Sequence, residues 1–247
     1  CDRRQRQMCI RDSPQAILKH KGIIANPNCS TIIMVMALKP IYDLAKIKRV
    51  IVSTYQAVSG AGKEGIDELD AQVREHSEGR EMTANILPSS SAEKHYPIAF
   101  NLIPQIDVFC DNLYTKEEMK MVNETKKIME DYEMRITATT IRVPVYRSHS
   151  ESVNIELEKE VDLGAMREAL AKFPGVTVQD DPSKQEYPMP LYTSEKDDVY
   201  VGRLRRDESC EKSYNMWVVG DQIRKGAALN TLQIAETMIK NLSLIHI

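Results

Sequence analysis

The stretch Asn26-Pro27-Asn28-Cys29-Ser30-Thr31 marks the point where extended chain turns into an unusually apolar helix. The chain from Ile32 to Leu38 is apolar without interruption, which predicts that this helix is buried. Pro40 predicts that the helix ends at about Leu38, because proline removes a backbone donor and clashes with the preceding turn. Cys29 is then expected in the first helical turn, where unpaired N–H groups and the helix dipole favour an anion.

A cysteine in that position is a candidate nucleophile. A free thiol titrates near ~8.5, and a helix N-terminus is one of the environments that lower this pKa and favour the reactive thiolate. The alternative is that Cys29 is a small buried hydrophobe, which is the more frequent role of a lone cysteine beside an apolar run. Spacing alone leaves both interpretations open.

Composition and charge exclude several classes of protein. Of 247 residues, 42% are hydrophobic and 28% are charged, and the formal net charge is −3. This ordinary globular balance gives no broad basic surface, so it argues against nucleic acid and anionic membranes as partners. No apolar run reaches the roughly 18 residues that a membrane-spanning helix needs, and no signal peptide is recognisable.

The cysteines give no sign of a disulfide framework or a metal site. They are odd in number, widely spread, and form neither a C-x-x-C pair nor a Cys/His cluster at zinc spacing. They are Cys1, Cys9, Cys29, Cys110 and Cys210. This usage predicts a reducing, cytoplasmic location and no bound metal.

A strand from Lys48 to Val58 is predicted by alternating β-branched residues, and it delivers Gln56 to a strand end. The glycine segment Ser59–Gly65 follows and matches G-x-G-x-x-G by letter. We reject a dinucleotide fingerprint here, because no second parallel strand follows within a compact unit of ~30 residues. A flexible turn that approaches a ligand and a simple strand-to-helix connection both remain open.

The next predicted helix carries a start signal and a pair of oppositely charged side chains. Thr115 and Glu118 form a capping box that opens a helix out to about Tyr132, with Met119, Val122 and Met129 as its core stripe. Glu117 and Lys120 are three residues apart on it, which favours a solvated ion pair.

A strand from Arg135 to Tyr146 places Arg142 on a face that is otherwise small and uncharged. Ser148–Ser152 is expected to interrupt it. His149 suits proton transfer by its unperturbed pKa of ~6.5, and surface decoration is the alternative.

The remaining pattern predicts alternating short strands and amphipathic helices. These elements are a short buried strand Gly22–Ala25, a helix from Ile66 through Leu69 and Val73, an irregular segment His95–Pro104, a strand Val153–Leu157, a helix capped by Asp162, the strands Val176–Val178, Val199–Leu204 and Met216–Val219, and a final helix from Gly226 to about Asn241 with Ala227, Leu232, Ala235 and Ile239 inward. This mixture predicts an α+β fold.

Several long stretches together resemble bacterial aspartate-semialdehyde dehydrogenase. They are Gly22–Thr31 (GIIANPNCST), Val52–Gly62 (VSTYQAVSGAG), Lys94–Asn101 (KHYPIAFN), Pro104–Asp107 (PQID), Arg142–Val145 (RVPV), Ser148–Ser152 (SHSES) and Met216–Val219 (MWVV). The resemblance extends from about Gly22 to Asn241.

The resemblance implies reductive dephosphorylation of L-aspartyl-4-phosphate to L-aspartate-4-semialdehyde by NADPH, through a thioacyl intermediate, in lysine, threonine and methionine biosynthesis. It implies a homodimer with a catalytic and dimerisation domain like that of glyceraldehyde-3-phosphate dehydrogenase, a mostly antiparallel sheet with flanking helices. The related N-acetylglutamyl-phosphate reductase is an alternative, although a Glu117 contact to a free substrate amine argues against it.

The resemblance also implies roles for individual residues. Catalytic roles fall to Cys29 as nucleophile, His149 as general acid/base that takes the thiol proton, and Gln56 as the residue that orients the substrate. Substrate contacts fall to Arg142 for the carboxylate, Glu117 for the amine, and Lys120 and Asn28 for phosphate. Cofactor contacts for NADP fall to Ser59, Gly60 and Asn230.

The start of the chain departs from the family pattern. The family's glycine fingerprint and its first phosphate-binding arginine are missing, so we expect a fragment that lacks most of the Rossmann domain and is inactive alone. The expected divisions are a non-native leader or remnant (1–21), the catalytic and dimerisation domain (22–225), a helix that packs on the absent nucleotide-binding domain (226–242) and a non-native tail (243–247). A non-catalytic dimerising fragment is the alternative function.

Overall fold

A six-stranded mixed sheet is the centre of the computed structural model, which describes residues 7–8, 24–90 and 92–242. Its strand order is β4-β3-β5-β8-β7-β6. The β3–β4 and β6–β7 pairs are parallel, and the three pairs between them are antiparallel. The predicted α+β fold with a mostly antiparallel sheet is confirmed.

The helices and strands follow one another with short connections, except for the long irregular segment between α3 and α4. The strands are β1 (Gln7–Met8), β2 (Ile24–Ala25), β3 (Ile47–Gln56), β4 (Arg135–Arg142), β5 (His149–Leu157), β6 (Val176–Val178), β7 (Val199–Arg206) and β8 (Ser213–Gly220). The helices are α2 (Cys29–Leu44), α3 (Lys63–Ser77), α4 (Lys116–Ile128), α5 (Leu163–Lys172), α6 (Pro190–Thr193) and α7 (Leu229–Leu242). Tighter or wider turns cover Val58–Ala61, Pro182–Lys184 and Arg224–Ala228.

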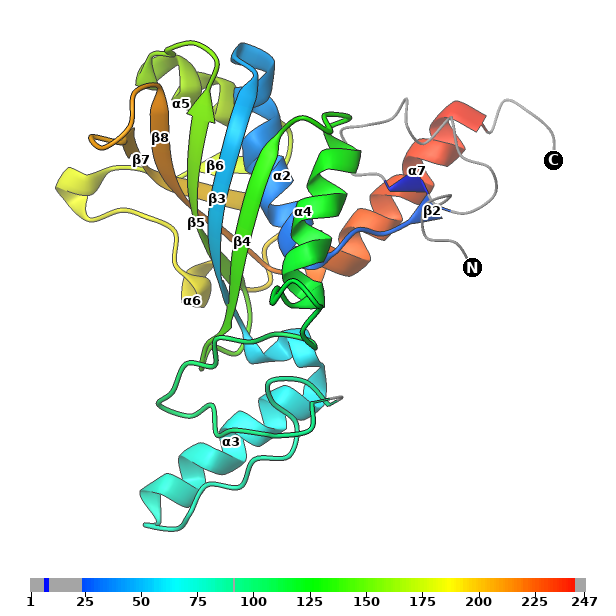
Figure 1. The fold of residues 1–247 in the computed structure, drawn as a ribbon, viewed down its shortest axis with the longest axis vertical. Coiled ribbons are helices and arrows are strands. Elements are labelled where there is room, and N and C mark those ends of the chain that lie inside the picture. The colour runs from blue at the N-terminus through cyan, green and yellow to red at the C-terminus, as the bar shows by residue number, and fades with distance from the viewer. Residues whose placement is uncertain (1–6, 9–23, 91, 243–247) are drawn as a thin grey trace.

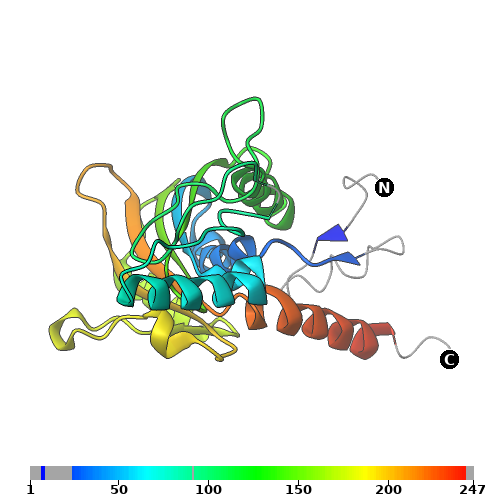
Figure 2. The same ribbon diagram turned by 90° about the horizontal axis from the view of Figure 1, so that it is seen from below.

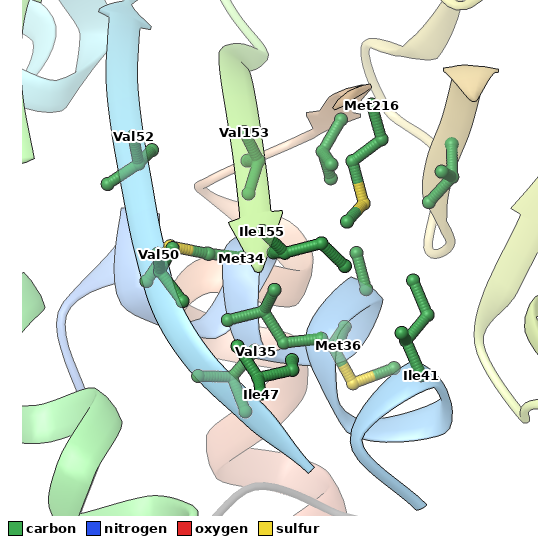
Figure 3. Packing of buried hydrophobic residues seen from close by; sticks show 14 of the residues in the cluster. Met34, Val35, Met36, Ile41, Ile47, Val50, Val52, Val153, Ile155 and Met216 are labelled. Atoms are coloured by element: carbon green, nitrogen blue, oxygen red, sulfur yellow. The ribbon is translucent and has the colours of Figure 1, made fainter. Parts of the chain in front are cut away.

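Helix α2 is the core element of the fold. Every residue from Ser30 to Leu38 is buried, as the uninterrupted apolar run predicts. Figure 3 shows Met34, Val35 and Met36 of this helix packed among side chains of β3, β5 and β8. Each fully buried aliphatic side chain of this kind contributes about 1.5–3 kcal/mol, so this contact fixes α2 on the sheet.

The predicted end of α2 at Leu38 is wrong. The helix continues to Leu44 with Pro40 inside it. Pro40 and Ile41 are both buried, so tertiary packing outweighs the backbone hydrogen bond that proline cannot make.

Strand β3 alternates as predicted and sets two rows of side chains across the sheet. Val50, Val52, Thr54 and Gln56 are all buried on the face toward α2. Thr54 pairs with Thr140 on one side and with Glu151 on the other. The next row is formed at the strand ends, where Gln56 pairs with Arg142 and His149 pairs with Gly220.

The capping box of α4 is confirmed, because Thr115 and Glu118 exchange both hydrogen bonds. Of the predicted stripe, Met129 is buried, but Met119 and Val122 are only half-buried. Met121, Thr125 and Ile128 are buried instead. Glu117 and Glu118 are buried as well, so the inward face of this helix carries polar as well as apolar side chains.

Strand boundaries shift where the sequence suggested an interruption. Strand β4 ends at Arg142 rather than at Tyr146, and β5 runs unbroken from His149 to Leu157. The Ser148–Ser152 stretch therefore lies mostly inside β5, since its backbone pairs with β8 despite its polar side chains.

Helix α3 and the irregular segment after it lie beyond the ends of the strands (Figure 1). Leu69 is buried there, whereas Val73 is 40% exposed, so the predicted stripe ends one turn early. The side chain of Gln72 accepts hydrogen bonds from the N–H groups of Ile98 and Ala99. Polar side chains of α3 thus hold the predicted irregular segment.

Helix α7 projects to one side of the sheet, beside β2 (Figures 1 and 2). The predicted start at Gly226 is replaced by a wide turn over Arg224–Ala228. Its inward side chain is Ile234, against which Ile24 and Met238 pack, whereas Leu232 and Ile239 are exposed. The predicted inward face is therefore wrong, because the helix packs against β2 and not against the sheet.

Strand β2 is only half-buried, contrary to the predicted buried strand, because its partner β1 is just two residues long. The predicted strand positions Gly22 and Ile23, like most of the expected leader and the whole tail, lie outside the described residues. No helix in the part of the chain that the structure describes combines the length and the apolar character that a membrane span needs.

Candidate active site

Cys29 and His149, 120 positions apart in sequence, lie side by side at the end of the sheet. The Cys29 Sγ atom is 3.5 Å from His149 Nε2. Cys29 is the first residue of α2 and His149 is the first residue of β5, so two rigid elements hold the pair. The His149 side chain is fully buried. The arrangement puts an imidazole nitrogen within reach of any group bonded to the sulfur.

The other ring nitrogen of His149 is held by the backbone. The N–H of Ala57, just past the end of β3, donates to His149 Nδ1 at 3.1 Å. This hydrogen bond fixes the orientation of the ring, because a flipped ring would place carbon there.

Arg142 lies in the same row of the sheet as His149 and is only 3% exposed. Its Nη1 donates to the carbonyl oxygen of Ala57 at 2.8 Å. Its Nε atom is buried and has no hydrogen-bond partner among the described residues. A buried guanidinium with an unused donor fits a planar anion such as a carboxylate.

Asn28 both caps α2 and joins it to α4. Its Oδ1 accepts from the backbone N–H of Thr31 at 3.1 Å, as expected of an N-cap residue. Its own N–H donates to Glu124 Oε2 at 2.7 Å, and its Nδ2 donates to Glu117 Oε1 at 2.8 Å. The start of α2, and with it Cys29, is therefore anchored by two carboxylates.

Glu117 joins the remaining predicted substrate residues. Besides Asn28, its Oε1 accepts from Gln56 Nε2 at 3.3 Å, and its Oε2 lies 3.3 Å from Lys120 Nζ. Glu117 is 6% exposed, so the solvated ion pair suggested by spacing is wrong on its carboxylate side. Lys120 also pairs with Asp107, and its side chain keeps 35% exposure, which leaves the ammonium at an open rim.

The expected low pKa of the Cys29 thiol is not found. Burial raises the pKa of Cys29 to about 12, and the Glu117 carboxylate adds to the rise. The Ser30 N–H and the Arg142 guanidinium act in the opposite direction without outweighing them. The helix N-terminus is present, but it lies in a site that excludes water, where desolvation of the thiolate dominates.

Gly60 and Ser59 form one wall of this site. A Cβ atom on Gly60 would lie 2.7 Å from Arg142 Nη1 and 3.2 Å from His149 Cε1, so only glycine leaves both side chains in place. Ser59 is buried, and its Oγ accepts from Gln222 Nε2.

Asn230 on α7 is bonded to the segment that precedes Cys29. It is fully buried and donates to Asn26 Oδ1 at 2.7 Å. Gly226, one turn earlier, approaches the nucleophile, since a Cβ atom there would lie 2.9 Å from Cys29 Cβ. Neither Gly226 nor Glu124 could be recognised from local sequence as part of the site, because the carboxylate of Glu124 and the missing side chain of Gly226 act only through tertiary contacts. Over residues 24–90 and 92–242 we find no cluster of His, Cys, Asp and Glu side chains that could hold a metal ion.

Glu151 is an unexpected buried acid one row beneath the site. It is fully buried, and neither carboxylate oxygen has a hydrogen-bond partner among the described residues. Burial raises the pKa of Glu151 well above its usual value. The folded protein therefore keeps this carboxyl protonated at pH values where the unfolded chain, with a pKa of ~4.3, releases the proton.

We expect Glu151→Gln to stabilise the protein increasingly as pH rises. Above pH ~4.3 ionisation of this carboxyl lowers the free energy of the unfolded wild-type chain, whereas the folded chain keeps the proton. The free energy of unfolding of the wild type therefore falls by at most about 1.4 kcal/mol per pH unit relative to the variant. Denaturant unfolding from about pH 5 to 8 measures this difference.

Glu156→Gln, on the same strand, is the matched control with the opposite sign. Lys48 lies 3.0 Å from Glu156 and lowers the pKa of that carboxyl. The ionised Glu156 carboxylate therefore stabilises the folded protein above the pKa of this group in the unfolded chain, and the stabilisation is lost as pH falls. Glu156→Gln is expected to be less stable than the wild type at neutral pH. A constant Glu151→Gln difference across the pH range would contradict a buried neutral acid.

Comparison with known proteins agrees with this geometry. A family model described as semialdehyde dehydrogenase, dimerisation domain, matches residues 38–225. The aspartate-semialdehyde dehydrogenase of Aquifex aeolicus is 54% identical over 222 residues, which are 90% of this chain and 64% of that protein. The chain belongs to the aspartate-semialdehyde dehydrogenase family.

Other members of the aspartate-semialdehyde dehydrogenase family give the same result. The Bacillus subtilis enzyme is 52% identical over 223 residues, covering 90% of this chain and 64% of that protein. The solved aspartate semialdehyde dehydrogenase II of Vibrio cholerae complexed with ASA has a TM-score of 0.90 at 42% identity, covering 97% of this chain and 69% of that chain. The chain thus spans about 64% of the length of the two bacterial relatives.

Proposed function

We propose that the protein takes part in the NADPH-dependent conversion of L-aspartyl-4-phosphate to L-aspartate-4-semialdehyde, with Cys29 as the group that carries the acyl intermediate. The observation that supports this most directly is the 3.5 Å approach of Cys29 Sγ to His149 Nε2 beside the buried Arg142. Membership of the aspartate-semialdehyde dehydrogenase family and the ASA complex of the Vibrio cholerae relative agree with this substrate class.

The substrate residues surround the sulfur in a chemically consistent way. Arg142 has a buried donor for the substrate carboxylate, and Glu117 provides a buried acceptor for the substrate amine. Gln56, which Glu117 holds by a hydrogen bond, is placed to orient the reacting acyl group. Lys120 at the open rim and Asn28 at the start of α2 are proposed contacts of the phosphate group.

The wall formed by Ser59 and Gly60 is the proposed place of the nicotinamide. The residues fit a flat ring there, because Gly60 leaves the Arg142 and His149 side chains uncovered where a Cβ atom would collide with them. When bound, NADPH supplies the hydride. Asn230 on α7 is proposed to contact the cofactor from another side.

Gly60→Ala is expected to reduce activity by about tenfold or more without unfolding the protein, because misplacing reacting groups by ~1 Å costs up to about 10²-fold. The added Cβ would displace Arg142 Nη1 or the His149 ring. Steady-state rates together with thermal unfolding measure the effect. An unchanged rate, or a loss that only follows a lower melting temperature, would contradict this role.

Residues 22–225 are proposed as the catalytic and dimerisation domain of a homodimer. The sheet face opposite α2 carries the half-buried Tyr55 and Trp217, whose ring centroids lie 5.5 Å apart, and offers a surface for a second copy. The exposed Leu232 and Ile239 on α7 are proposed to meet a nucleotide-binding domain. Light scattering tests the dimer, and a monomer at micromolar concentration would contradict it. The cytoplasmic location remains a prediction.

The proposed activity is tested on the longest protein that the natural gene encodes. We expect phosphate-dependent reduction of NADP when L-aspartate-4-semialdehyde is supplied. N-acetylglutamate-5-semialdehyde, which lacks a free amine, is the control substrate and is expected to fail because Glu117 cannot bind its acylated nitrogen. Turnover of the control substrate alone would replace this proposal with the reductase alternative. No turnover of either aldehyde, with alkylation of Cys29 intact, would favour a non-catalytic dimerising chain.

A further inference from the structure

A row of polar side chains lies directly beneath the candidate active site. It crosses three strands in register, with Thr140 on β4, Thr54 on β3 and Glu151 on β5. All three residues are fully buried. The next row away from the site contains Val52 and Val153 of the hydrophobic core. The polar row therefore lies between the reacting groups and the core, where bulk water does not reach.

This row holds polar atoms that have no hydrogen-bond partner among the described residues. They are Thr140 Oγ1 and both carboxyl oxygens of Glu151. Paired residues on neighbouring strands have Cβ atoms about 4.5–5.5 Å apart, so these oxygens and Thr54 Oγ1 belong to one small polar space. Buried polar groups are nearly always paired, and ordered water is the usual partner where no protein atom is in reach. The three side chains supply the several partners that a buried water needs.

Thr54 connects this row to the active site. Its Oγ1 accepts from Gln56 Nε2 at 3.4 Å, and Gln56 Nε2 also donates to Glu117 Oε1 at 3.3 Å. A flipped amide would set its carbonyl oxygen against the Glu117 carboxylate, so these two contacts determine which end of Gln56 is left for the substrate. A hydroxyl that accepts from Gln56 still has its own proton to donate, and the neighbours of Thr54 in its row are Thr140 and Glu151.

Glu151 suits this environment as a neutral acid. Burial raises the pKa of Glu151 well above its usual value. A protonated carboxyl has one O–H donor and a carbonyl acceptor, whereas a carboxylate can only accept. Glu151 can therefore both donate to a water molecule and accept from one, without placing a charge beneath the site.

We propose that Glu151 and Thr54 are positioning residues, which together with water bound between them form a buried hydrogen-bond network that holds the Gln56 amide in place. Both side chains are fully buried, so they act on the substrate only through Gln56. The water site is a property of the folded protein, whereas its effect on turnover rests on the proposed function.

A high-resolution crystal structure of the longest encoded protein tests the network directly. We expect ordered water within hydrogen-bond distance of both the Glu151 carboxyl group and Thr54 Oγ1, and no such water in Glu151→Leu. Electron density that shows no water between these two side chains would overturn the proposal.

Substitutions of Thr54 test the connection to Gln56. Thr54→Val keeps the shape of the side chain and removes the hydroxyl. We expect it to lower kcat of semialdehyde oxidation about tenfold with little change in KM, as for one hydrogen bond that matters mainly in the transition state. Thr54→Ser restores the hydroxyl and should recover most of this loss. Thr139→Val, at an exposed position on the opposite face of β4, is the control and should match the wild type.

Substitutions of Glu151 separate positioning from stability. Glu151→Leu removes a buried acid, so we expect its melting temperature to be no lower than that of the wild type, while kcat falls about tenfold. Glu151→Gln keeps a donor and an acceptor and should retain most of the rate. Wild-type rates in both Glu151→Leu and Thr54→Val, or rate losses that only follow a lower melting temperature, would overturn the positioning role.

A failure of this proposal differs from a failure of the proposed function. Absence of turnover in the unsubstituted protein would refute the proposed function, and the crystal structure would still decide whether water joins Glu151 to Thr54. Turnover that is unaffected by Glu151→Leu and Thr54→Val would leave the proposed function in place and refute the network alone.

Discussion

Replacing Cys29 by serine is expected to reduce turnover of the longest encoded protein by at least about 10³-fold, because a serine hydroxyl is a far weaker nucleophile than a thiol. Steady-state rates of semialdehyde oxidation with NADP and phosphate measure the loss.

Cys210→Ser is the matched control for this substitution. Cys210 is also a free cysteine, and it lies in the turn between β7 and β8, at the opposite end of the strands from His149. We expect its rates to equal those of the wild type. Residual turnover above one tenth in Cys29→Ser, or an equal loss in Cys210→Ser, would contradict the assignment of the nucleophile.

Arg142→Lys is expected to lower kcat/KM by about 10²-fold, mainly through KM. The guanidinium uses Nη1 to hold the carbonyl of Ala57 and retains Nε as a buried donor for a second contact. A lysine ammonium keeps the charge but cannot make both contacts in one plane, and a lost charge-assisted bond costs about 1.5–3 kcal/mol. Rates measured as a function of semialdehyde concentration separate KM from kcat.

Arg135→Lys on the same strand is the control for charge and position. Arg135 begins β4, and its side chain is 65% exposed and paired with Glu156. This substitution should leave both kinetic constants unchanged. An unchanged KM in Arg142→Lys would remove Arg142 from the proposed carboxylate site.

Local sequence patterns predicted those parts of the fold that depend on local rules. Alternation in β3 identified the face that carries Thr54 and Gln56, and the capping box placed the start of α4 at Thr115. The apolar run identified α2 as the buried helix. In each case the local preference and the tertiary packing agree, which is when sequence patterns are reliable.

Predictions failed where tertiary contacts compensate for a local cost. Pro40 lies inside α2 because the flanking residues are buried, and α4 presents Glu117 because Asn28, Gln56 and Lys120 satisfy its carboxylate. The inward face of α7 is selected by contact with Ile24. None of these partners is close in sequence, so no local window contains the information.

The candidate site shows the same division. Residue types and the family resemblance pointed to Cys29, His149 and Arg142, and the structure brings these three together at one end of the sheet. The direction of the Cys29 pKa shift could not be predicted, because the sequence reveals the helix N-terminus but not the burial or the nearby Glu117 that oppose it. The role of Ala57 resides in its backbone, which a residue type does not report.

The central claim, that Cys29 accepts the acyl group of the substrate, is tested most directly by the acylation half-reaction, which needs no nicotinamide cofactor. The chain is mixed with L-aspartyl-4-phosphate, quenched in acid and digested, and the peptides are analysed by mass spectrometry. We predict an aspartyl adduct on the peptide that contains Cys29, absent from Cys29→Ser and present in Cys210→Ser. An unmodified Cys29 peptide, or an adduct that persists in Cys29→Ser, would contradict the account.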